Sequence, residues 1–345
     1  MNLSVIRKLV QIAAFGFMVY GSGLIGYYTV DKFSNALPAL SCAFNHNTGD
    51  YCTLIPFQHQ MAHRVGETIA NNGDLLQGLM PTLITLGTFL ILFVFLSKAF
   101  CGWICPLGTF QELLSMLGQK LGLQQRESVD EKIVKRTRPV KWLVLFFLVF
   151  FFPILTGLGY ASHDLVDPYC KICPSRILTT LTNGNTDQLV VDQANPVTMG
   201  FSIFGDFLFG LMIALALTVR QPFCRICPML AMNATFRKIG LLKLVKNASS
   251  RCEKCGLCAK ACPMDIREIH TEMVKKDVTF EDCTLCGRCV EFCPDENVLQ
   301  LKYATIPVFK ASPQYFKKRK KAQKEWEKTT LASLKQPAVQ PEAKN

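Results

Sequence analysis

Hydrophobic residues gather in four long windows that contain almost no charged side chain. The windows are residues 9–30, 75–97, 142–162 and 197–219, and only the last is interrupted, by Asp206. Each is long enough to cross a bilayer, for which a helix needs roughly 20 apolar residues. One such window is compatible with a buried helix of a soluble protein, but four in one chain favour membrane spans. The first window could also be a signal peptide, but no A-x-A-like cleavage site follows it, so we interpret it as a retained anchor.

Lysine and arginine are unevenly distributed among the loops, and this bias predicts the orientation. Residues 1–8 carry two and residues 98–139 carry seven, whereas the acid-rich loops 31–74 and 163–196 carry two each. Because loops rich in Lys and Arg stay on the cytoplasmic side, we expect both termini, and everything after Arg220, to be cytoplasmic. The two acid-rich loops then face the periplasm, and the sequence predicts a multi-pass protein of the bacterial inner membrane.

The composition agrees with membrane segments and limits other interpretations. Half of the 345 residues are hydrophobic, and the net charge is +12. Residues 310–345 hold ten Lys and Arg against three acidic residues, so most of the positive charge belongs to a polar tail and is no evidence for a nucleic-acid surface. We expect residues 311–345 to form a disordered basic tail; contact with anionic lipid is the alternative. Sixteen cysteines in a chain of this length exclude a small disulfide scaffold.

Eight of the cysteines form two copies of one spacing. Each copy reads Cys-x2-Cys-x2-Cys-x3-Cys-Pro, and the copies begin at Cys252 and Cys283. In bacterial ferredoxins the first three cysteines of a copy hold one cubane cluster, and the fourth crosses to the other. The spacing therefore predicts one [4Fe–4S] cluster at Cys252, Cys255, Cys258 and Cys293, and a second at Cys283, Cys286, Cys289 and Cys262. Zinc is the alternative, but structural zinc favours two separate ligand pairs.

Cysteine pairs also follow the hydrophobic windows, in an arrangement that repeats. Cys101 and Cys105 come directly after the second window, Cys224 and Cys227 come directly after the fourth, and a proline follows the second cysteine of each pair. Both pairs lie on the predicted cytoplasmic side, so together they supply four ligands for a third [4Fe–4S] cluster. Reducing conditions disfavour disulfides there, so a different metal site or a redox-active thiol pair is the alternative.

The remaining four cysteines lie in the two predicted outer loops. They are Cys42, Cys52, Cys170 and Cys173. They either hold a fourth [4Fe–4S] cluster or form disulfides, which an oxidising compartment favours. A bilayer core of about 30 Å is too wide for one efficient electron hop, so a quinone or a haem is expected between the outer and inner clusters if both exist. No Cys-x-x-Cys-His motif occurs, which argues against covalent c-type haem.

Asp206 is the one charged residue inside a predicted span. Only 13 residues separate it from the end of its window, so we expect it in the outer leaflet, where a carboxylate is costly and often functional. It is either a hydrogen-bonded packing residue or a proton acceptor beside a quinol, with His163 at the outer end of the third span as a partner. Quinol oxidation releases protons with its electrons, so a titratable group near the quinol is required.

Taken together, these elements resemble the NapH-type membrane ferredoxins and their NosR and CcoG relatives. The resemblance rests on Cys101-Gly102-Trp103-Ile104-Cys105-Pro106 after a span, on a second element at residues 224–228, and on the eight-cysteine segment; it covers roughly residues 1–310. The second element is Cys-x2-Cys-Pro, where Cys-x3-Cys-Pro is usual in the family, and the outer pair at residues 170–173 is not carried over from the family. The resemblance implies electron exchange between the quinone pool and a partner oxidoreductase.

The sequence thus predicts a mostly α protein, with a bundle of four transmembrane helices and an α+β ferredoxin-like domain that holds two [4Fe–4S] clusters. The predicted parts are a first membrane half (1–97), a cytoplasmic loop (98–139), a second membrane half (140–249), the ferredoxin domain (250–310) and the tail (311–345). We expect a membrane electron-transfer subunit that works with respiratory oxidoreductase subunits or a soluble redox protein. The alternatives are an accessory reductase that serves the assembly of a metalloenzyme, and a redox sensor or membrane anchor.

Overall fold

The computed structural model describes residues 3–25, 54–123, 129–182, 184, 186–193, 195–247, 252, 255–314, 316–318 and 320–321, with side chains of the first segment up to residue 16. This part of the chain is mostly helical and includes a three-stranded sheet near its C-terminal end. Cys42, Cys52, the end of the first predicted span and most of the predicted tail lie outside the described residues. The predictions for those residues stay predictions.

Three helical segments among the described residues are long and apolar enough to cross a membrane. They are α5 (Leu75–Leu96), the continuous run Glu131–Gly157 and α12 (Pro196–Ala216), and they correspond to the last three predicted windows. Many of their apolar side chains are exposed on the protein surface: Ile84 on α5 is 63% exposed, and Phe207 on α12 is 61% exposed. Uncovered apolar surface of this kind is expected where lipid surrounds a protein.

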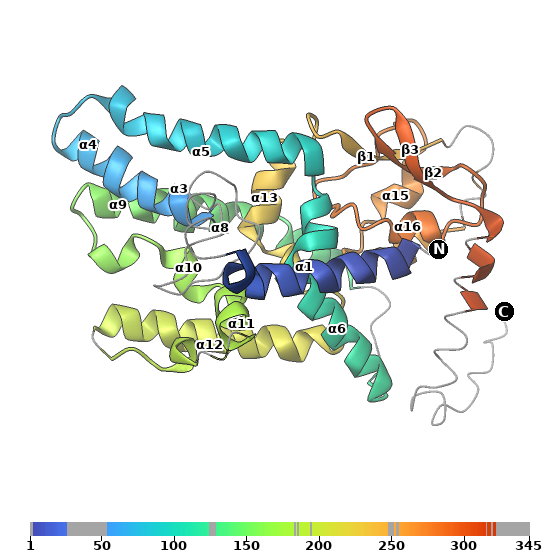
Figure 1. The fold of residues 1–345 in the computed structure, drawn as a ribbon, viewed down its shortest axis with the longest axis horizontal. Coiled ribbons are helices and arrows are strands. Elements are labelled where there is room, and N and C mark those ends of the chain that lie inside the picture. Colours follow the sequence, from blue (N-terminus) through green and yellow to red (C-terminus); the bar gives the residue numbers. More distant parts are fainter. Residues whose placement is uncertain are drawn as a thin grey trace.

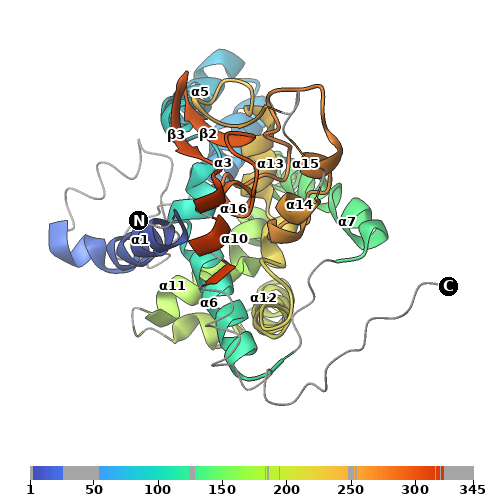
Figure 2. The same cartoon turned by 90° about the vertical axis from the view of Figure 1, so that its right-hand side faces the viewer.

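Helix α1 (Leu3–Ile25) covers most of the first predicted window, but residues 26–30 lie outside the described part. A bundle of four spans therefore stays a prediction. Figure 1 shows α1, α5 and α12 aligned with the long axis of the molecule, with the strands at one end of that axis. Figure 2 looks along the axis from the strand end, so that α12 is seen end-on.

The Glu131–Gly157 segment packs closely against the helices that precede α5. It consists of α7 (Glu131–Thr137), α8 (Val140–Val144), η3 (Leu145–Phe151) and α9 (Phe152–Gly157), and the helices before α5 are α3 (Leu54–Gln60), η1 (Met61–Gly66) and α4 (Glu67–Ala70). At the crossing of α9 with η1, a Cβ on Gly157 would lie 2.1 Å from the carbonyl oxygen of Ala62. Glycine is therefore required there for the two helices to approach, as is common between membrane helices.

A short helical segment turns back along α12 between the last two spans. It contains η4 (His163–Leu165), α10 (Pro168–Ile172), α11 (Pro174–Thr182) and η5 (Asp187–Leu189). Helices α10 and α11 both pack on α12, and α11 also packs on α6 (Pro106–Lys120), which follows the second span. In Figure 1, α10 and α11 accordingly lie beside the middle of the long helices and not at their far end.

The ferredoxin unit combines the sheet with three short helices. Strands β1 (Leu242–Lys246), β2 (Leu299–Tyr303) and β3 (Ile306–Lys310) are antiparallel in the order β1-β2-β3, and the helices are α14 (Leu257–Ala261), α15 (Glu268–Thr271) and α16 (Arg288–Glu291). Leu244 of β1 pairs with Leu301 of β2, and both side chains are buried in the core of the unit. Because β1 belongs to this sheet, the unit begins before residue 250, earlier than the predicted boundary.

Candidate iron–sulfur centres

The thiols of the eight-cysteine segment lie in two groups, and each group takes one member from the other copy of the motif. Cys262 ends the first copy, but its thiol lies among those of the second, where burial and then the charges of Cys286 and Cys283 raise its pKa. A cavity closed mainly by apolar side chains is lined by Cys262, Cys283, Cys286 and Cys289. These are the four residues that the motif assigns to the second cluster.

The group of thiols assigned to the first cluster likewise takes one cysteine from the other copy of the motif. Cys293 ends the second copy, and burial raises its pKa to about 12, with the charges of Cys258 and Cys255 adding to the effect. Burial raises the pKa of Cys258, and the charges of Cys255 and Cys252 add to that rise. The structure therefore brings together both sets of four thiols that the motif spacing assigns.

The donor set fits iron–sulfur clusters better than a single metal ion. All cysteines in the described residues are free thiols. Within the same residues, no three His, Cys, Asp or Glu side chains lie close enough together to hold a single ion. Thiols spaced around an enclosed, mainly apolar cavity are the ligands that a cubane requires, and the residues therefore fit that group.

The prolines of the membrane motifs set the position of the cysteines that precede them. Cys105 and Cys227 are the N-cap residues of α6 and α13 (Pro228–Thr235), and proline takes the first helical position after each. Proline is favoured there because it lacks an N–H that would otherwise have no partner. The first free backbone N–H groups of α6 and α13 therefore lie close to the Cys105 and Cys227 side chains, where they oppose the rise in pKa that burial causes at both thiols. A helix N-terminus stabilises a thiolate in this way.

Two buried carboxamides connect the two membrane motifs. Gln111 on α6 donates from Nε2 to Sγ of Cys224 at 3.6 Å, and its Oε1 accepts the N–H of Phe223 at 3.1 Å. Asn233 on α13 donates from Nδ2 to Sγ of Cys101 at 3.3 Å. Each carboxamide stands six residues after the second cysteine of its own pair and contacts the first cysteine of the other pair. Sequence reasoning missed both residues, although this equal spacing was a signal that could have found them.

The four thiols of the inner pairs lie together. Burial, and then the charges of Cys105 and Cys227, raise the pKa of Cys101. Burial and the same two thiols also raise the pKa of Cys224. Each of the four side chains is partly buried. The four inner thiols are therefore close enough to influence one another, which makes them candidate ligands of a further cluster.

Cys173 lies beside the inner thiols, not a bilayer away from them. Burial, and then the charges of Cys173 and Cys105, raise the pKa of Cys227 to about 12. The hydroxyl oxygen of Tyr169 lies 3.6 Å from Sγ of Cys173 and 3.9 Å from Sγ of Cys227. The predicted separation of inner and outer sets is therefore not met for Cys173, because α10 and α11 turn back along α12. Cys42 and Cys52 lie outside the described residues.

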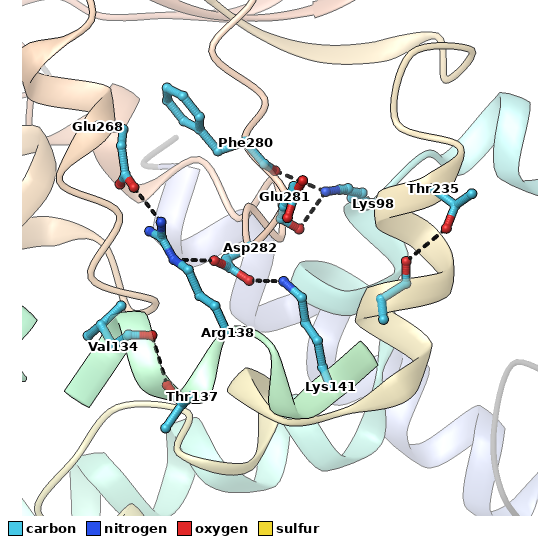
Figure 3. A network of polar contacts seen from close by, with 11 residues as sticks. Lys98, Val134, Thr137, Arg138, Lys141, Thr235, Glu268, Phe280, Glu281 and Asp282 are labelled. Carbon is cyan, nitrogen blue, oxygen red and sulfur yellow. Dashed lines mark hydrogen bonds and ion pairs between the residues drawn. The ribbon is translucent and has the colours of Figure 1, made fainter. Parts of the chain in front are cut away.

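A network of buried charges holds the ferredoxin unit on the membrane part (Figure 3). Asp282 pairs with Lys141, and its Oδ2 lies 2.8 Å from Nε of Arg138. Lys98, just after the second span, donates from Nζ to the backbone oxygens of Phe280 and Glu281 at 2.9 and 2.7 Å. Removing one partner of such a buried pair is strongly destabilising, so these contacts fix the unit in one place.

The loop that carries the inner cysteines packs directly on the loop that carries the second ferredoxin set. A Cβ on Gly102 would lie 2.4 Å from the carbonyl oxygen of Thr284, and Nε1 of Trp103 donates to the backbone oxygen of Leu285 at 2.9 Å. Lys98 lies between the two sets: burial lowers its pKa to about 8, and the charges of Cys283 and Cys101 oppose that shift. The loops that carry the two sets of thiols are therefore in direct contact with each other.

Asp206 lies halfway along α12, and one of its carboxylate oxygens, Oδ1, is buried without a hydrogen-bond partner. His163 is exposed, and its ring centre lies 5.4 Å from that of His63. Among the described residues, no hydrogen bond or ion pair joins Asp206 to His163. The structure therefore does not bring the two predicted proton acceptors together.

Comparison with known families matches both cysteine regions. A 4Fe-4S binding domain matches residues 79–124 and 201–247, which contain the two inner pairs, and a 4Fe-4S dicluster domain matches residues 244–294. The second match also begins within β1, as the sheet does. No solved structure matches the chain.

Three relatives share much of the sequence. The putative electron transport protein YccM of Escherichia coli is 31% identical over 66% of this chain and 58% of its own length. The ferredoxin-type protein NapH of Escherichia coli is 25% identical over 65% of this chain and 70% of its own length, and the regulatory protein NosR of Pseudomonas aeruginosa is 27% identical over 61% and 26%. The chain thus spans little more than half of YccM and about a quarter of NosR.

The spanning helices, the converging thiols and the matched domains define an iron–sulfur electron-transfer protein of a membrane. Within that class, the chain belongs to the NapH-type polyferredoxin family, to which its NapH, NosR and YccM relatives point. The resemblance noted from the cysteine motifs is therefore confirmed.

Proposed function

We propose that this protein exchanges electrons between the quinone pool and a partner oxidoreductase of a respiratory complex. The observation that carries the proposal is the contact between the Gly102–Trp103 loop and the Thr284–Leu285 loop, since each loop bears cysteines of a candidate centre. [4Fe–4S] clusters, when bound, accept and release single electrons. A fixed contact between two ligand loops provides a short path between two such centres.

The proposed ligands follow the groups of thiols described above. Two [4Fe–4S] clusters belong to the ferredoxin unit, with Cys252, Cys255, Cys258 and Cys293 as one set and Cys283, Cys286, Cys289 and Cys262 as the other; Cys101, Cys105, Cys224 and Cys227 hold a third. Gln111 and Asn233 donate hydrogen bonds to the thiols of Cys224 and Cys101 in the third set. Hydrogen bonds to ligand sulfur are one of the means by which proteins set a cluster's potential.

The chemistry on the membrane side requires a proton acceptor, and Asp206 is the candidate. Its Oδ1 is buried without a hydrogen-bond partner near the centre of a span, where a carboxylate is costly and commonly functional. Oxidation of a quinol releases protons, and Asp206 would accept one at this oxygen. His163 stays a second proposed acceptor, at the exposed end of the third span and apart from Asp206.

The orientation also remains a proposal, based on the distribution of Lys and Arg. We assign the protein to the bacterial inner membrane, with both termini and the ferredoxin unit in the cytoplasm. Its partners are then respiratory oxidoreductase subunits or a soluble redox protein that reaches the cytoplasmic face.

Anaerobic reduction of the purified protein by a quinol analogue tests the proposal. We expect the visible absorbance of the clusters to bleach on addition of the quinol. Cys101→Ser should remove about one cluster and leave the spectrum of the two clusters in the ferredoxin unit unchanged. Asp206→Asn should slow the bleaching at unchanged iron content, whereas the exposed loop residue Asp192 (Asp192→Asn) is the matched control and should not. Loaded clusters that quinol cannot reduce would contradict the proposal and favour a sensor or anchor.

An accessory reductase is the second candidate, favoured by the match to the regulatory protein NosR. In that case the chain would serve the maturation of a metalloenzyme and not its turnover. Co-purification distinguishes the two: a subunit stays bound to its oxidoreductase, whereas an accessory protein is needed only while the enzyme is assembled. Loss of activity of a fully assembled enzyme after depletion of this protein would exclude the accessory role.

A further inference from the structure

The start of helix α1 turns a polar face toward the protein and an apolar face outward. Ser4, Arg7 and Gln11 are 6%, 2% and 4% exposed, whereas Leu9 and Ile12 are 57% and 60% exposed. The three buried residues are spaced by three and four positions, which places them on one side of the helix. Lipid accounts for the exposed apolar side chains, but a buried arginine needs partners within the protein.

The guanidinium of Arg7 reaches the ferredoxin unit. Its Nη1 donates to the backbone oxygen of Cys286 at 3.3 Å, and its Nη2 lies 2.5 Å from Oε1 of Glu112 on α6. Cys286 lines the same cavity as the other thiols of the second ferredoxin set. A positive charge from the first helix is therefore held at the backbone of a candidate cluster ligand.

The neighbours of Arg7 on the same face hold the two ligand loops as well. Gln11 donates from Nε2 to the backbone oxygen of Gly102 and to Oε2 of Glu112, both at 3.2 Å. The N–H of Ser4 donates to Oε1 of Glu291 on α16 at 3.3 Å, and Figure 1 shows the start of α1 beside that helix. Helix α1 therefore contacts the inner ligand loop and the ferredoxin unit together.

Arg7 and Glu112 form an ion pair that is largely shielded from water, since their side chains are 2% and 12% exposed. Burial acts to raise the pKa of Glu112, but the charges of Arg7 and Arg288 outweigh it, so the pKa lies below its ordinary value and the carboxyl is ionised. Reduction of a [4Fe–4S] cluster adds one electron and hence one negative charge. A cation held nearby stabilises that charge, and an anion opposes it.

We propose that Arg7 is a positioning residue of the electron path. It holds the Cys286 loop beside the Gly102 loop, and its charge, balanced by Glu112, sets the reduction potential of the centre that Cys286 serves. This inference rests on the proposed electron-transfer function and names a residue that regulates it. An ion pair that only anchors α1 is the ordinary alternative, and the two differ in the signs of the shifts that substitutions cause.

An EPR-monitored redox titration of the anaerobically purified full-length protein, with chemical mediators in place of quinol, tests the role of Arg7. Arg7→Met should lower one midpoint potential at unchanged iron content. The ratio of oxidised to reduced cluster should change roughly tenfold, which is about 59 mV for one electron. Glu112→Gln should raise the same midpoint, because Arg7 then lacks its counter-charge. Arg7→Lys keeps the charge and should return the midpoint most of the way to the wild-type value.

Lys8→Met is the matched control, because it removes a positive charge from the next residue of α1, whose side chain is partly exposed. Water and salt screen such a charge, so the ratio should change less than about twofold. An equal shift in Lys8→Met, or shifts of one sign in Arg7→Met and Glu112→Gln, would overturn the inference, as would unmoved midpoints.

The remaining outcomes are also decisive. If Arg7→Met does not fold or loses its iron, the rise expected for Glu112→Gln decides, and a fall or no change there overturns the role of the Arg7 charge. A wild type without reducible clusters would instead refute the proposed function, and this inference with it. Failure of the inference alone leaves wild-type clusters in place, so the two failures are distinguishable.

Discussion

Asp282→Ala removes the carboxylate at the centre of the contact between the ferredoxin unit and the membrane part. Asp282 is 6% exposed and pairs with Lys141, which is fully buried, and with the half-exposed Arg138. Alanine leaves the Lys141 ammonium buried without a counter-charge, and loss of one partner of a buried pair costs about 3–5 kcal/mol. Arg138 regains water and adds little. The docked state should therefore weaken by a factor of roughly 10²–10⁴.

Hydrogen exchange measures this effect in the intact holoprotein. Slowly exchanging amides of the ferredoxin unit that face the membrane part report the free energy of local opening. Glu281→Ala is the matched control, because the Glu281 side chain is exposed while its backbone oxygen still accepts from Lys98. We expect the control to stay within about 0.5 kcal/mol of wild type, as surface substitutions usually do.

The double variant Asp282→Ala/Lys141→Met separates charge burial from lost packing. Removing both charges should recover most of the loss, since an apolar replacement of a whole buried pair is often neutral. If Asp282→Ala alone leaves the opening free energy within about 0.5 kcal/mol of wild type, the charge network does not hold the unit and the reasoning is refuted.

Three further substitutions test other contacts. Gly102→Ala places a methyl group 2.4 Å from the carbonyl oxygen of Thr284; it should slow electron exchange between the ferredoxin and membrane centres, measured by rapid-freeze EPR, at unchanged iron content. Gly157→Ala should destabilise the membrane part by about 1–3 kcal/mol in denaturant titrations, whereas Gly200→Ala, which meets open space, should not. Gln111→Leu leaves a buried N–H and a ligand sulfur without their partner; it should cost about 1–3 kcal/mol and shift one midpoint potential, and an unchanged redox titration would count against the inner centre.

The sequence anticipated the parts of the molecule that depend on local spacing. The crossing of Cys262 and Cys293 between the two groups follows from the motif itself, and the structure brings those thiols together as expected. Three apolar windows became helices of spanning length because their composition alone decides that property.

Other features depend on contacts between distant segments, which no local pattern contains. Strand β1 looks like the end of a membrane half until its pairing with β2, some sixty positions later, assigns it to the ferredoxin unit. The return of α10 and α11 along α12 was missed because each is far too short to register as a membrane element. Hydropathy placed Cys173 in an outer loop, whereas tertiary packing puts it beside Cys227.

The inner thiols also impose an order on biosynthesis. Cys101 and Cys105 leave the ribosome long before Cys224 and Cys227, so this ligand set is incomplete until the last span has been inserted. The Gly102 loop then becomes covered by the Thr284 loop, which is made later still. If these thiols hold the proposed third cluster, iron and sulfide would enter the inner site after insertion and before the ferredoxin unit closes over it. The proposed cluster would then have to be delivered at the membrane during that interval.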